Sequence, residues 1–112
     1  LKVEHIVVCG HYGCGGVKAA LDDLSLGLID GWLEPIKKLV AVNQSTLDSI
    51  ADPEARFAKM CEINVARQVQ NVCENAIVQA AWERGQPLAI HGWIYSLQDG
   101  LLKDLDCSVA GA

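Results

Sequence analysis

The sequence predicts an α/β fold in which a parallel pair of strands is flanked by helices. Two apolar runs, 3–10 and 87–97, predict strands, and the first, rich in β-branched residues and ended by a glycine, is typical of a buried parallel strand. The segment between them carries helical spacing, and parallel strands need a helical connection of this kind. Two or three strands are few for such a sheet, so we expect further strands to come from outside this sequence.

The elements of the first half follow from local signals. The run VEHIVVCG at 3–10 predicts a strand that ends on a glycine, and GGVKAALDDL at 15–24 predicts a short helix. Pro35 favours the first turn of a helix, so the next helix is expected to begin near Glu34, with 28–32 as a preceding turn. The polar segment 43–52 predicts a loop or a single helical turn.

The second half opens on a strong helix start, in which Asp52 caps, Pro53 takes the first position and Glu54 lies in the first turn. One apolar stripe then predicts a helix to about residue 73; its members are Phe57, Met60, Cys61, Val65, Val69, Val72 and Cys73. A further helix is expected over 74–85, ending at Gly85. After the strand at 87–97, the segment 100–109 predicts a third, shorter strand.

Composition limits the class of protein. The 112 residues suffice for one domain, and 51% of them are hydrophobic. The formal charge of −5 argues against a nucleic-acid or anionic-membrane partner. No apolar run approaches the roughly 18 residues of a membrane span. The five cysteines are scattered, which favours a reducing compartment: the cytoplasm, with an organelle as the alternative.

The spacing of His11 and Cys14 is the main chemical signal. Both lie in a glycine-rich loop between the first strand and the first helix. The glycine order does not fit a dinucleotide fingerprint. Four interpretations stay open: an anion at the helix start, a cysteine nucleophile, a metal held by imidazole and thiolate, and a plain glycine turn.

A family resemblance sharpens this choice. The segment VCGHYGCGGVKAAL resembles the second zinc motif of the β-class carbonic anhydrases. The likeness continues through LGLIDGWLEPIKKL and through CEINVARQVQNVCENAIVQAAWERGQPLAIHGWIYSLQDGLLKDLD, which includes H-G-W-x-Y and D-G-L-L. The resemblance implies a β-carbonic-anhydrase-like parallel sheet flanked by helices. Residues 1–112 are then expected to be the C-terminal part of a single domain, incomplete at the N-terminus.

The resemblance also implies roles for particular residues. His11 and Cys14 correspond to two zinc ligands, and the backbone N–H of Gly15 to a group that faces the substrate. The family's C-x-D-x-R motif, with another ligand cysteine and an Asp-Arg pair, is absent here and expected upstream of Leu1. Tyr95 occupies the place of a tyrosine that helps bind regulatory bicarbonate in one subgroup.

The implied activity is the reversible hydration of CO2 to bicarbonate and a proton by a Zn2+ enzyme that forms a homodimer or a higher homo-oligomer. The isolated 112-residue chain is expected to be inactive, because two ligands do not make a catalytic zinc site. One alternative is a non-catalytic fragment or degenerate relative that acts as an interaction module. A weaker one is a redox protein that uses Cys9 and Cys14.

The remaining candidate residues favour structural roles. Cys9, Cys61, Cys73 and Cys107 lie on apolar patterns and are expected in the core. His5 and His91 are expected to be structural histidines within strands. The three tryptophans are expected in the core or at a subunit contact; they are Trp32, Trp82 and Trp93.

Overall fold

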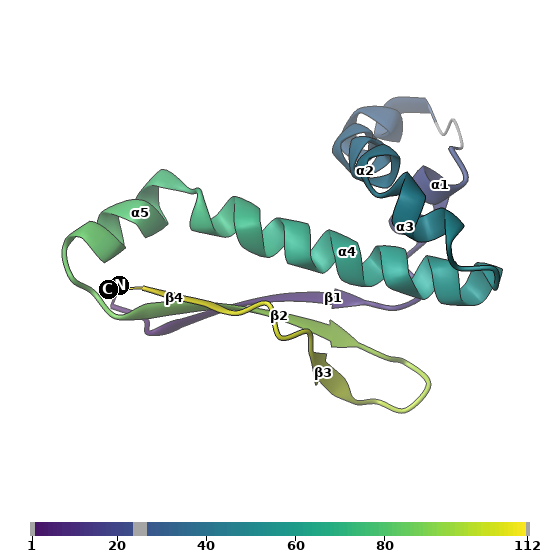
Figure 1. The fold of residues 1–112 in the computed structure, drawn as a ribbon. Helices are drawn as coiled ribbons and strands as arrows, with labels where there is room; N and C mark the ends of the chain where they lie inside the picture. Colours follow the sequence, from purple (N-terminus) through teal and green to yellow (C-terminus); the bar gives the residue numbers. More distant parts are fainter. Residues whose placement is uncertain (1, 24–26, 112) are drawn as a thin grey trace. The chain divides into compact units, whose positions relative to one another are not determined.

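A computed structural model describes residues 2–23 and 27–111. The elements are β1 (His5–His11), α1 (Gly15–Leu21), the 3-10 turn η1 (Gly27–Ile29), α2 (Asp30–Val42), α3 (Gln44–Asp48), α4 (Pro53–Cys73), α5 (Ala76–Glu83), β2 (Leu88–Tyr95), β3 (Leu102–Asp104) and β4 (Val109–Gly111) (Figure 1). The chain divides into two compact units. The sheet unit comprises residues 1–10 and 65–112, and the helical unit comprises residues 11–64.

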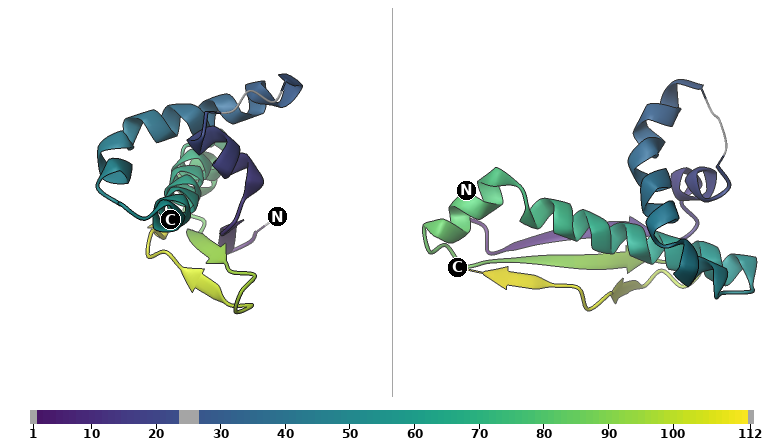
Figure 2. Two further views of the ribbon diagram at one scale, coloured as in Figure 1. Left: turned by 90° about the vertical axis from the view of Figure 1, so that its right-hand side faces the viewer. Right: turned by 45° about the horizontal axis from the view of Figure 1, so that its top comes forward.

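Four strands form the sheet, with β2 at its centre. β1 lies beside β2 and runs parallel to it (Figures 1 and 2). On the other side of β2, β3 and β4 are antiparallel, with Trp93 opposite Asp104 and Ala89 opposite Ala110. The predicted third strand is therefore two short strands. Asp106, between them, has a positive φ of 55°, which extended pairing does not allow.

The core of the sheet unit lies under α5 and the C-terminal part of α4, which cover one face of the sheet (Figure 1). Alternate residues of β2 are buried, as a strand with one covered face requires. The buried cluster joins both helices to β2; its members are Val69, Cys73, Val78, Ala81, Leu88 and Ile90. Trp82 packs against this cluster and donates a hydrogen bond from Nε1 to the Leu88 carbonyl at 2.9 Å, so the ring closes the end of the core.

The opposite face of the sheet is more open. On β1 the side chains of His5, Val7 and Cys9 are exposed. Within the described part of the sheet unit, both helices lie on the other side (Figure 1). The expectation that Cys9 belongs to the core is therefore wrong, because strand alternation turns it to the open face while Val8 packs inward. Cys61 and Cys73 are buried as predicted, and Cys107 is half-buried.

In the helical unit, α1 packs against α2. The buried residues of α1 are Val17, Ala19 and Ala20, and Leu33 is buried on α2. α2 begins at Asp30, four residues before the predicted start, and contains Pro35. Pro35 and Gly31 are both exposed, so water can satisfy the Gly31 carbonyl that proline leaves without a donor. Trp32 is 84% exposed and therefore lies outside the core of this unit.

The predicted start of α4 is confirmed: it begins at Pro53, and the Ala55 N–H donates to the Asp52 carboxylate at 3.3 Å. The polar segment before it contains one short helix, α3, as expected. Arg56 ties this segment to α4 by donating to the carbonyls of Leu47 and Ile50. Among the described helices, none is long and apolar enough to cross a membrane.

Candidate metal-binding loop

His11 is the last residue of β1, and its side chain is exposed. Its Nδ1 donates a hydrogen bond to the Tyr12 carbonyl at 2.9 Å. This contact places the ring proton on Nδ1, so the lone pair of Nε2 is left to bind a ligand. Metal-bound histidines are typically oriented by such a bond from the other ring nitrogen, and His11 is therefore prepared to coordinate through Nε2.

The chain turns between the two predicted ligands at Gly13, whose φ of 74° lies in the left-handed region. Cys14 follows in an extended conformation, with φ −66° and ψ 118°, and occupies the N-cap position of α1. Its carbonyl accepts a hydrogen bond from the Lys18 N–H at 3.0 Å, whereas its side chain makes no capping bond. The half-buried thiol is free, so its sulfur is available as a metal ligand.

The glycines after Cys14 shape the surface beside the sulfur. Gly15 is exposed, and a Cβ added there would meet nothing within 4 Å, so the backbone at this residue borders open space. A Cβ on Gly16 would lie 3.6 Å from Leu33 Cδ2 and 3.9 Å from Cys14 Sγ. The helix start therefore lets α2 approach closely while the space next to Gly15 stays free.

A contact that sequence reasoning missed fastens this loop. Tyr12, between the two predicted ligands, donates a short hydrogen bond from its hydroxyl to the Glu62 carboxylate on α4. Burial and the bond to the negatively charged Glu62 raise the pKa of Tyr12 to about 12. The two residues are 50 positions apart, and no local pattern pairs them.

Cys61, one residue before Glu62, also lies next to the loop. Burial is the main cause that raises the pKa of its thiol, and backbone groups of Cys14 and Gly13 partly oppose this effect. Cys61 is 2% exposed, so this thiol forms part of the packed floor beneath the loop rather than its surface.

The donor set of the loop fits zinc, because neutral imidazole and thiolate are ligands that zinc prefers. His11 and Cys14 supply two such donors from one tight turn. Within residues 2–23 and 27–111, no group of three or more His, Cys, Asp or Glu side chains is placed to hold a metal ion. Among the described residues, His11 and Cys14 therefore offer two donors that suit zinc, fewer than the three protein ligands that a catalytic zinc site uses.

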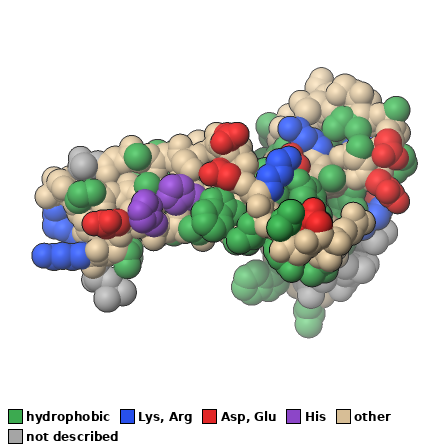
Figure 3. Space-filling view, turned by 90° about the horizontal axis from the view of Figure 1, so that it is seen from below, with side chains coloured by type: hydrophobic (Ala, Val, Ile, Leu, Met, Phe, Trp, Pro, Cys, Tyr) green, Lys and Arg blue, Asp and Glu red, His purple; other side chains and the backbone are tan. Residues whose placement is uncertain are grey.

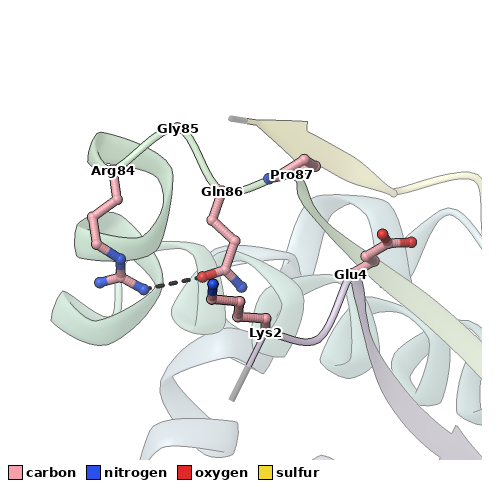
Figure 4. A pocket seen from close by; sticks show the side chains of 6 residues that line it. All are labelled: Lys2, Glu4, Arg84, Gly85, Gln86 and Pro87. Carbon is pink, nitrogen blue, oxygen red and sulfur yellow. Dashed lines mark hydrogen bonds between the residues drawn. The ribbon is translucent and has the colours of Figure 1, made fainter.

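Tyr95 lies in the sheet unit, at the end of β2, and is half-buried. Its hydroxyl would be 3.9 Å from a Cβ added to Gly100 in the following turn. A pocket of about 490 Å³ occurs elsewhere in the same unit, lined by Lys2, Glu4, Arg84, Gly85, Gln86 and Pro87 (Figure 4). None of the residues with a predicted role lines that pocket, so it does not coincide with either predicted site.

Comparisons with known proteins agree with the resemblance. A carbonic anhydrase family model matches residues 1–102. A carbonic anhydrase of Emericella nidulans is 44% identical over 99% of this chain, and one of Pseudomonas aeruginosa is 34% identical over 95%. This sequence therefore belongs to the carbonic anhydrase family of the β class.

Solved structures extend the agreement to the fold. The Coccomyxa β-carbonic anhydrase in complex with acetazolamide covers 99% of this chain with a TM-score of 0.89 and 40% identity. A tetrameric β-carbonic anhydrase of Sordaria macrospora covers 96% with a TM-score of 0.86 and 34% identity. This chain covers 50% and 55% of those two chains and 49% of the Emericella protein, so it spans about half the length of its relatives.

Proposed function

We propose that this chain forms the C-terminal part of a zinc-dependent carbonic anhydrase that interconverts CO2 and bicarbonate. The observation that carries the proposal is the H-x-x-C loop, in which His11 has Nδ1 engaged by a backbone carbonyl and Cys14 presents a free thiol. In carbonic anhydrases, bound zinc supplies a nucleophile near neutral pH by lowering the pKa of its water ligand.

Several residues of this chain would have separate roles around the bound zinc. His11 Nε2 and Cys14 Sγ would hold the metal, and the Tyr12 carbonyl, by accepting from Nδ1, would keep the His11 ring in the required tautomer. The open space beside Gly15 leaves room for a substrate next to its backbone N–H, the role that the family likeness suggests. The third protein ligand and the Asp-Arg pair of the family's C-x-D-x-R motif would come from a segment outside residues 1–112.

Three expectations depend on this proposal. The 112-residue chain alone is inactive, because it supplies only two of the required ligands. The complete protein is a homo-oligomer, which the tetrameric structures from Sordaria macrospora support by family likeness. Tyr95, half-buried at the end of β2, is the residue of this chain that would contribute to a regulatory bicarbonate site.

Zinc analysis and a stopped-flow CO2 hydration assay test the proposal on the complete protein. We expect about one zinc per chain, and loss of both zinc and turnover in His11→Ala and Cys14→Ser. Cys9→Ser is the matched control, since Cys9 is an exposed thiol on the open face of the sheet and should leave both unchanged.

Full zinc retention in Cys14→Ser, or a complete protein without zinc, would contradict the assignment. The 112-residue chain is assayed separately with added zinc. A turnover that His11→Ala abolishes would show that this chain builds a working site alone. A folded complete protein without hydration activity would instead favour a non-catalytic interaction module.

A further inference from the structure

The turn between His11 and Cys14 is attached to α4 at two consecutive residues of that helix. Tyr12 donates a hydrogen bond from its hydroxyl to the carboxylate of Glu62, 50 positions away in the sequence. Cys61, the residue before Glu62, is buried beneath the turn. All these residues belong to the helical unit, so the contacts depend on packing inside one compact unit rather than on an exposed surface.

The peptide between Tyr12 and Gly13 is held from both sides. Its carbonyl accepts the hydrogen bond from His11 Nδ1 at 2.9 Å. Its N–H points the opposite way, because the peptide is trans. Burial raises the pKa of the Cys61 thiol, and backbone hydrogen bonds from Cys14 and Gly13 oppose this rise, as N–H donors to sulfur do. The peptide therefore lies between the His11 ring and the Cys61 sulfur.

Gly13 leaves this peptide free to rotate unless its neighbours hold it. Glycine populates positive and negative φ about equally, and Gly13 has a φ of 74°. A rotation of the peptide would turn the Tyr12 carbonyl away from His11. A His11 ring without this acceptor can carry its proton on Nε2, which then has no lone pair for a metal. The bond from Tyr12 to Glu62 opposes the rotation, because it fixes the residue before Gly13 to α4.

The orientation of His11 matters because the other two of the chain's three histidines are engaged with each other. His5 Nδ1 lies 3.0 Å from His91 Nε2. Histidine side chains are seen side by side in the view of the sheet from below (Figure 3). His11 is therefore the imidazole that this chain has left for the loop.

We propose that Tyr12, anchored by Glu62, is a positioning residue that holds His11 in the tautomer required for zinc binding. The inference rests on the proposed function, because that proposal makes His11 a zinc ligand. Loss of a group that orients a metal-bound histidine typically lowers metal affinity by about 10- to 100-fold. We expect the lower end of this range, because the Tyr12 hydroxyl acts on the ring through the peptide.

The zinc affinity of the complete protein, measured by competition with a chromophoric chelator, tests the anchor. We expect Tyr12→Phe and Glu62→Ala each to weaken zinc binding about tenfold. The double variant should be no weaker than either single variant, because both lose the same hydrogen bond. Glu62→Gln should bind zinc nearly as well as the wild type, since its amide oxygen still accepts from Tyr12. Glu54→Ala, in the first turn of the same helix, is the matched control and should leave the affinity unchanged.

Nitrogen NMR of the metal-free complete protein tests the cause directly. The wild type should carry the His11 proton on Nδ1, whereas Tyr12→Phe and Glu62→Ala should move part of the population to Nε2. A general loss of stability does not change a tautomer in the folded state, and urea unfolding of the same variants measures that loss separately. Glu54→Ala should keep the wild-type tautomer.

Unchanged zinc affinity in Tyr12→Phe, or an unchanged His11 tautomer, would overturn the positioning role. Additive losses in the double variant would overturn it as well, because the two side chains would then act separately. If Glu62→Ala does not fold, Tyr12→Phe decides, since it removes a single oxygen atom. A wild-type protein without zinc would contradict the proposed function together with this inference, whereas tight zinc binding that Tyr12→Phe leaves unchanged would overturn the inference alone.

Discussion

Glycine has opposite functions in two regions of this chain. In the H-x-x-C loop, Gly13 has a φ of 74° and nothing within 4 Å of where a Cβ would lie, so the backbone conformation requires it. In β2, Gly92 is buried, and the space itself is missing: a Cβ would lie 2.5 Å from Cys107 Sγ and 3.0 Å from Val69 Cγ2. The loop is constrained by its conformation, whereas the strand is constrained by packing.

Gly92→Ala is expected to have the largest effect on stability. The new methyl group would overlap Cys107 and Val69, and overpacking of a core costs about 1–3 kcal/mol. Urea unfolding of the complete protein measures this loss. The Gly92→Ala/Cys107→Ala double variant should recover part of it, because the nearest atom is removed.

Gly31→Ala serves as the control for this substitution. Gly31 is an exposed residue within α2, and an added Cβ would meet nothing within 4 Å. Alanine is the better helix former by about 1 kcal/mol, so stability should rise or stay unchanged. Equal losses in Gly92→Ala and in the double variant would show that Cys107 is not the obstacle.

Gly13→Ala should cost about 1–2 kcal/mol, because an L-residue is strained at this positive φ. Gly13→Asn should cost less, since asparagine tolerates the left-handed region better. Gly15→Ala is the control for stability, because a Cβ there meets open space. Urea unfolding measures the stability of each variant. If Gly13→Ala were as stable as Gly15→Ala, the loop would have relaxed to another conformation.

Because of Tyr12, the stability of the protein is expected to fall as the pH becomes alkaline. Its pKa is raised to about 12 by burial and by Glu62, so the folded state keeps the phenolic proton that an unfolded tyrosine releases near pH 10. Stability from this group is complete below about pH 10 and falls as pH rises toward about 12. Tyr12→Phe should flatten this decline and cost about 1 kcal/mol at pH 8 through the lost hydrogen bond.

Urea midpoints recorded from pH 8 to about pH 11 test the Tyr12 effect. A slope that survives in Tyr12→Phe would assign the alkaline loss to other groups.

The smallest effect is expected from the ion pair on α1. Lys18 Nζ and Asp22 Oδ2 are 2.7 Å apart, the two residues are four positions apart in sequence, and their side chains are 52% and 38% exposed. Such surface pairs contribute about 0.3 kcal/mol, and the acidic partner at the C-terminal end of a helix reduces this further. Asp22→Asn should therefore leave the urea midpoint almost unchanged at physiological salt; a loss above about 1 kcal/mol would contradict this view.

Much of the secondary structure was predictable, because its signals are local. Asp52 and Pro53 mark the start of α4, and its apolar spacing extends to Cys73, where the helix ends. The H-x-x-C loop likewise appears between a strand and a helix, as predicted. The predicted start of α2 near Glu34 is wrong, because a proline favours the first turn but Pro35 lies inside this helix. The helix tolerates Pro35 because the Gly31 carbonyl, which proline leaves without a donor, is exposed to water.

The sequence by itself determined the position of the H-x-x-C loop between a strand and a helix, the helix boundaries near strong caps and the family, since each depends on residues close together along the chain. Tertiary structure decided that Cys9 faces outward, that Tyr12 meets Glu62 and that His5 meets His91. The two partners are 50 positions apart in the first contact and 86 in the second. Local patterns do not encode such distances; they follow from how a helix packs on a loop and how two strands align in a sheet.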